Sequence, residues 1–312
     1  MSTPPDISII MPAYDAAATI ADSVKSVQAQ TLKNWELIIV DDGSADSTAT
    51  IAFALADDDH RIRVICQDNQ GPSAARNHGV ADAKAQTIAF LDADDFWAPR
   101  RLTGMLSILA SHPDIGVLFS RTRFVDAETL KPGTLTRYIA DLTAADLMAE
   151  NAVCSTSNIV CRKTVFEQIG GFAKGLDYAE DQDWLLRVAL DRKWHIRGVD
   201  AEWFFYRSNE VSQSADLEAM RNGWQRMAAS ALEDHPVTAA LAARRAVGPI
   251  HRQLARRALR LGQRGKALQY ILIALWQDPL LLFRQPKRTA LTLLATFLVY
   301  IPNQKIRELV AK

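Results

Sequence analysis

Short apolar runs alternate with longer amphipathic stretches over the first 120 residues, and this alternation restricts the possible folds more than any other feature. The apolar runs are rich in β-branched and aliphatic residues, which is typical of buried strands. They lie at 7–11, 36–40, 61–65, 87–91 and 116–119, and the helical patterns between them lie at 16–30, 46–57, 73–83 and 99–111. Strand and helix repeated in this order predict an α/β fold, with right-handed crossovers and a mostly parallel sheet covered on both faces.

The remainder of the chain has a different character. From 121 to about 210 the pattern is irregular, with strand-like pieces at 158–161, 195–199 and 203–206 and a helical pattern near 181–190. From about 215 onward the sequence is helical and rich in Ala, Leu and Arg. These shifts predict a large domain at 1–212 and a basic, amphipathic helical region at 213–312.

Charge is distributed unevenly along the chain. The formal net charge is zero, which argues against a nucleic-acid binder, but residues 251–312 carry 12 Lys or Arg and only Asp278 and Glu308. A basic end of this kind suggests contact with an anionic surface such as a membrane. The three cysteines are too few for a disulfide framework, the first residues lack a signal-peptide pattern, and no run of 18 apolar residues occurs. We therefore expect a cytoplasmic protein.

Polar and charged residues follow the predicted strands where each strand ends. Because the carboxyl ends of parallel strands meet at one edge of a sheet, these residues are expected to lie close together. The first strand ends without the Gly-rich signature of a dinucleotide site. The four strand ends contribute Pro12, Ala13, Tyr14 and Asp15; Asp41 and Asp42; Asn69 and Gly71, followed by Arg76; and Asp92, Ala93 and Asp94.

Each of these groups has a functional and a structural interpretation. Asp92 and Asp94 are separated by one residue, so their carboxylates suit Mg²⁺ or Mn²⁺ bound together with substrate phosphates; the alternative is an acidic turn. Either Asp41 or Asp42 could accept a hydrogen bond from a nucleobase, or both could serve only the turn. Arg76 lies in a helix that opens at Gly71, where it could meet phosphate or remain solvated.

The four motifs, taken in order, resemble the family 2 glycosyltransferases, which are inverting enzymes of the GT-A fold. The resemblance is close over 7–100 and continues loosely to about 210. It implies a Rossmann-like sheet flanked by helices, with a nucleotide-binding half at 1–120, an acceptor half at 121–212 and a C-terminal helical region. The motifs that carry it are SIIMPAY at 8–14, ELIIVDDGSAD at 36–46, GPSAARN at 71–77 and FLDADD at 90–95.

The resemblance also implies a role for each matching residue. Pro12, Ala13, Tyr14 and Asp15 correspond to the first donor loop, and Asp41 to the residue that reads the nucleobase. Asn69, Gly71 and Arg76 correspond to positions that line the nucleotide. Asp92 and Asp94 correspond to the D-x-D pair that holds metal and diphosphate, with Ala93 beside the ribose.

A catalytic base is expected in the segment Tyr178-Ala179-Glu180-Asp181-Gln182-Asp183-Trp184, which resembles the acceptor-side motif of the family. Asp181 falls at the position of the base, and the chemistry requires one, because a sugar hydroxyl is a poor nucleophile until a carboxylate accepts its proton. A helix N-cap is the structural alternative for Asp181, and Asp183 is a weaker competitor for the role.

Two departures from the family pattern affect the expected chemistry. Asn209 follows Tyr206-Arg207-Ser208 where a histidine is frequent, which removes an expected contact to metal or phosphate. The Q-x-x-R-W signature of processive synthases does not occur after Asp183. We therefore expect transfer of one sugar per encounter.

The basic C-terminal region contains two apolar patches, Ile271–Trp276 with Leu280–Phe283, and Leu291–Tyr300. They could pack on the body of the protein, contact an anionic membrane at the cytoplasmic face of the inner membrane, or join two copies of the chain. A membrane contact would favour a lipid-linked acceptor.

The sequence predicts a metal-dependent inverting glycosyltransferase, with Mn²⁺ or Mg²⁺ as cofactor. The donor is expected to be a nucleoside-diphosphate sugar, by family habit a UDP-sugar, and the acceptor a glycan or lipid-linked hydroxyl in cell-surface polysaccharide or glycolipid synthesis. A sugar-1-phosphate nucleotidyltransferase is disfavoured, because its Gly-rich first loop is replaced by Pro12-Ala13-Tyr14. A non-catalytic nucleotide-sugar-binding scaffold is disfavoured, because Asp41, Asp92, Asp94 and Asp181 are all present.

Overall fold

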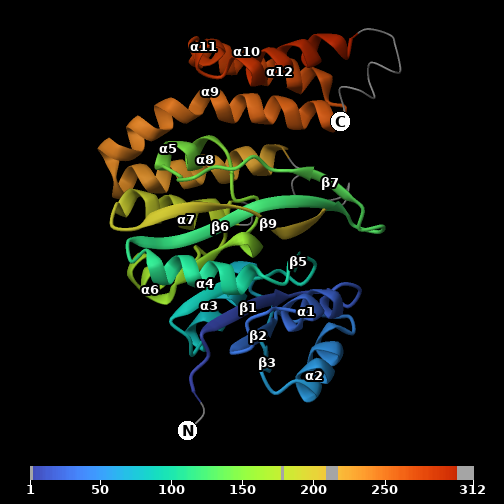
Figure 1. The fold of residues 1–312 in the computed structure, drawn as a ribbon. Coiled ribbons are helices and arrows are strands. Elements are labelled where there is room, and N and C mark those ends of the chain that lie inside the picture. The colour runs from blue at the N-terminus through green and yellow to red at the C-terminus, as the bar shows by residue number, and fades with distance from the viewer. Residues whose placement is uncertain (1–2, 177–178, 209–216, 301–312) are drawn as a thin grey trace. The chain divides into compact units, whose positions relative to one another are not determined.

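The chain folds into two compact units (Figure 1). A computed structural model describes residues 3–176, 179–208 and 217–300. The sheet unit comprises Met1–Leu142 and Val153–Asn209, and the helical unit comprises Thr143–Ala152 and Glu210–Lys312. The short segment from Thr143 to Ala152 therefore belongs with helices that follow it by more than sixty residues, a grouping that no local pattern in the sequence indicates.

The first four strands form the parallel part of the sheet, in the order β3-β2-β1-β4. Their bounds confirm the predicted runs to within two residues at each end. They are β1 (Ile7–Ala13), β2 (Trp35–Asp41), β3 (Ile62–Cys66) and β4 (Thr87–Phe90). Their carboxyl ends lie at one edge, as the alternation of strand and helix predicts.

Beyond β4 the sheet becomes mixed. The short β8 (Val160–Arg162) lies antiparallel between β4 and β6 (Ile115–Asp126), so the predicted strand at 116–119 does not extend the parallel series directly. The pieces predicted at 195–199 and 203–206 form one strand, β9 (His195–Ser208), which runs parallel to β6. Two short antiparallel strands complete the sheet, β5 (Phe96–Trp97) on β9 and β7 (Pro132–Leu135) on β6.

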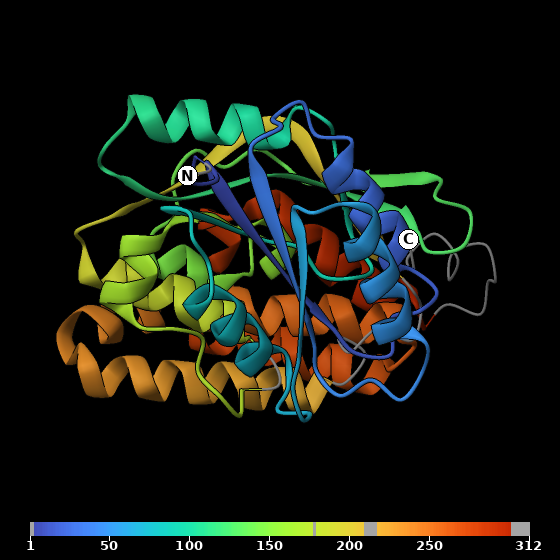
Figure 2. The ribbon, with the colours of Figure 1, turned by 90° about the horizontal axis from the view of Figure 1, so that it is seen from below.

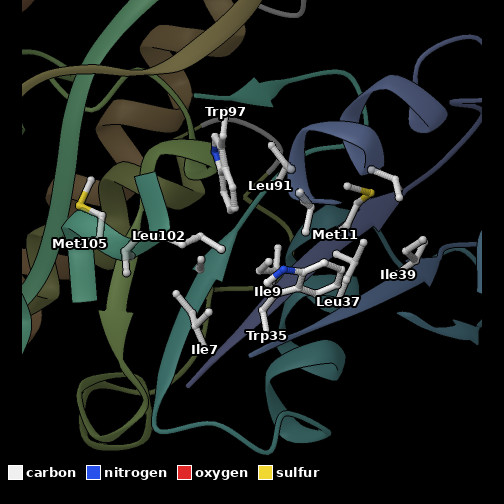
Figure 3. Packing of buried hydrophobic residues seen from close by; sticks show 14 of the residues in the cluster. Ile7, Ile9, Met11, Trp35, Leu37, Ile39, Leu91, Trp97, Leu102 and Met105 are labelled. Atoms are coloured by element: carbon white, nitrogen blue, oxygen red, sulfur yellow. The ribbon is translucent and has the colours of Figure 1, made fainter. Parts of the chain in front are cut away.

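Helices cover both faces of the parallel strands, which confirms that prediction. Side chains of β1 and β2 alternate between the faces, so Ile7, Ile9 and Met11 share one face with Trp35, Leu37 and Ile39, their register partners (Figure 3). Residues of α1, α2 and α4 pack there, among them Leu102 and Met105. These helices are α1 (Ile20–Gln28), α2 (Thr48–Asp58) and α4 (Arg101–Ser111), and α1 and α2 lie side by side (Figure 2).

Helix α3 (Pro72–Ala81) packs closely on β1 and β2 through Gly79. A Cβ at this position would lie 2.5 Å from Cγ2 of Ile10, so glycine permits the approach. Farther along, the sheet unit contains the 3₁₀ turn η1 (Thr156–Asn158), α6 (Lys163–Ile169) and α7 (Glu180–Asp191). The last of these confirms the helix predicted near 181–190.

The helical unit is built around its longest helix, α9 (Pro236–Arg260). Helices α5 (Ala144–Ala149) and α8 (Leu217–Asp234) lie on one side of it, and α10 (Arg264–Gln277), α11 (Leu281–Arg284) and α12 (Pro286–Leu298) on the other (Figure 1). Arg288 of α12 forms two hydrogen bonds to Glu150 at 2.7 and 2.9 Å, which ties the segment after α5 into the unit. Within the described ranges, no helix has the length and apolarity that crossing a membrane requires.

Candidate active site

The loops after β1 and β2 are bound to each other. Asp15 accepts a hydrogen bond from the amide of Ala45 at 2.8 Å, and its own amide donates to Oγ of Ser44 at 3.1 Å. Pro12 and Ala13 are the last residues of β1, and Tyr14 beyond them is 53% exposed. The predicted donor loop thus presents an aromatic ring to solvent while Asp15 holds the neighbouring loop.

Asp41 and Asp42 are both buried, but they have different surroundings. Asp42 accepts hydrogen bonds from Nε2 of Gln67 at 2.7 Å and from the amides of Gln70 and Gly71 at 3.0 and 2.8 Å, so it braces the third loop. Oδ1 of Asp41 has no hydrogen-bond partner among the described residues. Of the two carboxylates that the sequence left as alternatives, Asp41 is therefore the one with an acceptor available for a ligand.

The third loop carries Asn69 and Gly71 to the start of α3. Asn69 is exposed, and its backbone nitrogen lies close to Gly43. A Cβ on Gly43 would lie 3.0 Å from that nitrogen, so a larger residue at this position would collide with it. Gly71 has φ +85° and precedes Pro72, the first residue of the helix. Only glycine adopts this backbone conformation without strain, and its carbonyl accepts hydrogen bonds from the amides of Ala74 and Ala75 at the start of α3.

Arg76 connects two motifs that the sequence treats separately. Its Nη2 lies 2.7 Å from Oδ1 of Asp92, and its Nη1 lies 3.0 Å from Oε1 of Glu180, 104 residues further along the chain. Burial disfavours the charged guanidinium, but the two carboxylates outweigh that cost and raise its pKa. The solvated alternative for Arg76 is wrong, because the residue is 4% exposed.

Asp92 is held by the turn before β8 as well as by Arg76. Its amide donates to Oγ of Ser157 at 2.9 Å, and Oγ of Ser155 donates to its Oδ2 at 3.2 Å. Each oxygen of this carboxylate therefore accepts a hydrogen bond from a fixed donor. Sequence analysis missed both serines; a polar run, Ser155-Thr156-Ser157-Asn158, immediately before an apolar strand was the available signal.

A buried polar cluster supports this turn from behind. Oδ1 of Asn158 accepts hydrogen bonds from the amide of Ser120 at 2.9 Å and from Nη1 of Arg101 at 3.1 Å, and its Nδ2 donates to the carbonyl of Val153 at 3.1 Å. Arg101 is fully buried, which lowers its pKa to about 9. These hydrogen bonds fix the backbone that carries Ser155 and Ser157, whereas Nε and Nη2 of Arg101 have no hydrogen-bond partner among the described residues.

Negative charge is concentrated where β4 ends. The side chain of Asp94 is exposed, but the surrounding protein partly desolvates its carboxylate. This desolvation, together with the charge of Asp92, raises the pKa of Asp94 to about 6. Asp95 is buried and accepts a hydrogen bond from the amide of Arg207 at 3.1 Å; burial and the charges of Asp94 and Asp92 raise its pKa well above the ordinary value. Ala93 between the two acidic positions is 5% exposed.

This donor set suits a hard divalent cation. Carboxylate oxygens are its preferred ligands, and a cation would relieve the repulsion that raises the pKa of Asp94. No group of three or more His, Cys, Asp or Glu side chains in the described part of the chain could hold a metal by itself. Asp92 and Asp94 would therefore need oxygens from a bound phosphate to complete the coordination.

The first turn of α7 carries Glu180, Asp181 and Asp183. The helix begins at Glu180 after Ala179, so Asp181 is its second residue and the N-cap alternative is wrong. Burial raises the pKa of Glu180 to about 6, Arg76 opposes this, and Asp181 adds to it. Because Glu180 and Asp92 share the guanidinium of Arg76, the start of α7 lies beside the carboxylates that follow β4.

The two candidates for the base differ in their partners. Asp183 forms an ion pair with Arg187, Oδ2 to Nε at 3.0 Å. Asp181 is 6% exposed, and its Oδ1 accepts a hydrogen bond from the amide of Gln182 at 2.7 Å. Asp183 thus pairs with a cation one turn away, whereas Glu180, the residue before Asp181, shares Arg76 with Asp92. Tyr178 and Asn209 lie outside the described residues.

Comparison with known proteins identifies the family. The family model "Glycosyl transferase family 2" matches residues 8–170. The putative glycosyltransferase EpsH of Bacillus subtilis is 29% identical over 211 residues, 67% of this chain and 57% of that protein. The succinoglycan biosynthesis protein ExoU of Rhizobium meliloti is 43% identical over 107 residues, 34% of this chain and 31% of that protein. The chain thus spans little more than half of EpsH and a third of ExoU.

One further relative and two solved structures are matched over most of their own length. The Escherichia coli protein named UDP-Glc:alpha-D-GlcNAc-diphosphoundecaprenol beta-1,3-glucosyltransferase WfgD is 25% identical over 70% of this chain and 83% of that protein. Staphylococcus aureus TarS 1–349 in complex with UDP-GlcNAc has a TM-score of 0.61 at 17% identity, over 90% of this chain and 92% of that one. Mannosyltransferase PcManGT of Pyrobaculum calidifontis, in complex with GDP-Man and Mn²⁺, has a TM-score of 0.64 at 18% identity, over 99% and 84%.

Proposed function

This chain belongs to glycosyl transferase family 2, and we propose that it transfers one sugar from a nucleoside diphosphate to an acceptor hydroxyl, with inversion at the anomeric carbon. It is a glycosyltransferase with the GT-A fold. The observation that carries the finer proposal is the set of carboxylates at one edge of the sheet. Asp41 ends β2, Asp92 and Asp94 follow β4 on the other side of β1, and Arg76 joins Asp92 to the first turn of α7.

The donor occupies the strand ends in this proposal. Asp41 offers its unpaired Oδ1 to the nucleobase, and Tyr14 offers an exposed ring beside it. UDP is the proposed nucleotide. The names of WfgD and of the TarS complex mention UDP-sugars, whereas PcManGT was bound to GDP-Man, so the donor requires a direct test.

Mn²⁺ or Mg²⁺ is the proposed cofactor, held by Asp94 and Asp92 together with the donor diphosphate; when bound, it stabilises the charge that develops on the leaving group. The PcManGT complex with Mn²⁺ supports this choice. Hydrogen bonds from Arg76 and Ser155 hold the two oxygens of Asp92 in a fixed orientation. The exposed Asp94 is the ligand free to turn.

Asp181 is the proposed general base. It accepts the proton of the acceptor hydroxyl as that oxygen attacks the anomeric carbon, and the bond to the diphosphate breaks on the opposite face. Asp181 directly follows Glu180, which shares Arg76 with Asp92, and this position beside the carboxylates after β4 supports Asp181 over Asp183. Glu180 orients the same turn through Arg76 and does not need to touch the substrate.

The acceptor is proposed to be a glycan or a lipid-linked sugar in cell-surface polysaccharide or glycolipid synthesis. Relatives named for exopolysaccharide and undecaprenol-linked glycan synthesis support this class. We place the protein in the cytoplasm, peripherally on the cytoplasmic face of the inner membrane, because a lipid-linked acceptor would be presented there.

Calorimetric titration with UDP, GDP and dTDP, each with and without Mn²⁺, tests the proposal. Metal-dependent binding of UDP alone is the expected result, and Asp94→Ala should abolish it while the exposed Asp58→Ala, at the end of α2, leaves it unchanged. Binding of GDP or dTDP in place of UDP would change the donor class. No binding of any nucleotide would favour a non-catalytic scaffold and overturn the enzyme mechanism.

A further inference from the structure

Helix α12 has its polar and apolar faces reversed relative to an ordinary surface helix. Thr289, Thr292 and Thr296 are buried, each at 2% exposure or less. Their hydroxyls donate to carbonyls four residues earlier in the chain, at 2.7–2.8 Å, so the threonines need no outside partner. The larger apolar side chains on the opposite side are exposed: Leu291 66%, Leu294 56% and Phe297 57%.

Helices α10 and α11, which contact α12 or each other, also expose apolar side chains. Trp276 at the end of α10 is 82% exposed, and Phe283 in α11 is 81% exposed. These helices lie on the side of α9 away from α5 and α8 (Figure 1). We use the name outer face for the exposed residues Leu272, Trp276, Leu280, Phe283, Leu291, Leu294 and Phe297.

The surroundings of the outer face are strongly basic. Residues 236–300 contain eleven Lys or Arg and a single acidic residue, Asp278, which is buried and paired with Arg284. Arg284 and the exposed Lys287 are within four residues of Phe283 in sequence. Burial and the nearby charges of Arg260 and Arg288 lower the pKa of Arg256, so cations crowd together in this unit.

We propose that the outer face docks on the surface of an anionic lipid bilayer, with its aromatic and leucine side chains in the interface and Arg284 and Lys287 against lipid phosphates. Large apolar side chains beside cations, without exposed acidic residues among them, are what an interfacial helix requires. This inference rests on the proposed location of the protein at the membrane. It adds which surface of the protein contacts the lipid and how that surface is oriented, with α10–α12 along the membrane plane.

Charge favours lipid over a second copy of the chain. In a symmetric dimer the same patch would face itself, which would bring Arg284 and Lys287 of both copies together with the buried Asp278 as the one acidic residue of 236–300. An anionic lipid surface supplies a counter-charge. A dimer through the outer face therefore stands as the competing outcome of the test.

The test is flotation of the full chain with vesicles of phosphatidylcholine alone or mixed with phosphatidylglycerol. The unaltered chain should float with the mixed vesicles, and the double variant Trp276→Ser, Phe283→Ser should bind them about tenfold more weakly or worse. Both side chains are more than four-fifths exposed, so the variant should fold. Phe53→Ser, at a 49% exposed aromatic on α2, is the matched control and should float like the unaltered chain.

A second readout reports on the position of the face. Tryptophan emission should shift to the blue on anionic vesicles, and Trp276→Phe should remove most of that shift while the protein still floats. Equal binding to neutral vesicles, full binding by the double variant, or a dimer in sedimentation that the double variant dissociates would each overturn the proposal. Titration of the double variant with UDP and Mn²⁺ separates these failures from a failure of the proposed activity, since its nucleotide site is unaltered.

Discussion

Helices α1 and α12 are both amphipathic, but α1 buries its apolar face and α12 buries a face of threonines. In α1 the apolar Ile20, Val24 and Val27 pack into the core of the sheet unit, and charged residues face solvent. In α12 the threonines are inside, and Leu291, Leu294 and Phe297 are outside. An amphipathic pattern shows that a helix has two faces, but the neighbouring helices decide which face is buried. The unsatisfied apolar face of α12 therefore points to a contact beyond the unit.

The sheet unit also differs from the outer face in how its charged side chains are paired. There the counter-charges of Asp92 and Glu180 offset the burial of the charged Arg76. On the outer face of the helical unit, apolar side chains have no such partner in the described residues. Substitutions in the two regions should consequently affect different properties, stability and chemistry in one and membrane binding in the other.

The largest effect is expected for Arg76→Met. The change removes the one guanidinium shared by two carboxylates and leaves both in a poorly solvated position, which should cost about 3–5 kcal/mol of unfolding free energy. Urea unfolding followed by circular dichroism measures it. Arg100→Met, at an exposed arginine of the same unit, should change the value by about 0.5 kcal/mol or less. Equal losses for the two variants would show that the pairing with Asp92 and Glu180 is unimportant.

The next effect concerns chemistry alone. Asp181→Asn should reduce turnover roughly 10²-fold or more, because the amide cannot accept the acceptor proton, while affinity for UDP and Mn²⁺ stays unchanged. Steady-state transfer assays and calorimetry on the same preparation give the two values. Asp183→Asn is the comparison variant, and a larger loss of turnover there would assign the base to Asp183. Both variants should float with anionic vesicles as the unaltered chain does.

Much of the sheet unit could be predicted from sequence, because its signals are local. The alternation of Ile7, Ile9 and Met11 within an apolar run predicted β1, and the residues after each strand converge because parallel strands end at one edge. The place of Asp92 and Asp94 at this edge of the sheet could be predicted for the same reason.

Other features depend on contacts between distant residues, and no local period encodes them. The partner of Arg76 is Glu180, 104 residues away, and β8 is inserted between β4 and β6 although it follows both in the chain. Ser155 and Ser157 reach Asp92 only through that insertion. The direction in which α12 faces has the same cause, since the sequence gives its two faces but not its neighbours.

A smaller effect separates the two helices directly. Val24→Ser in α1 should cost about 2–3 kcal/mol of unfolding free energy, because it removes buried methyl groups and buries a hydroxyl. Leu294→Ser in α12 should change it by about 0.5 kcal/mol or less, because the side chain is already 56% exposed. Urea unfolding of both variants provides the comparison. A cost at Leu294 as large as that at Val24 would mean that its exposed side chain is covered in the protein in solution.

The smallest effect is expected for Thr292→Val on the buried side of α12. The hydroxyl of Thr292 donates only to the carbonyl of Arg288 in its own helix, and that carbonyl retains its place in the helical hydrogen-bond pattern when the hydroxyl is lost. Valine keeps the branched shape, so the unfolding free energy should change by less than about 1 kcal/mol, in either direction. Vesicle flotation should be unaffected as well, because the substitution leaves the outer face intact. A loss of several kcal/mol would show instead that the threonine face takes part in a polar contact, and the reversed polarity of α12 would then need no partner outside the unit.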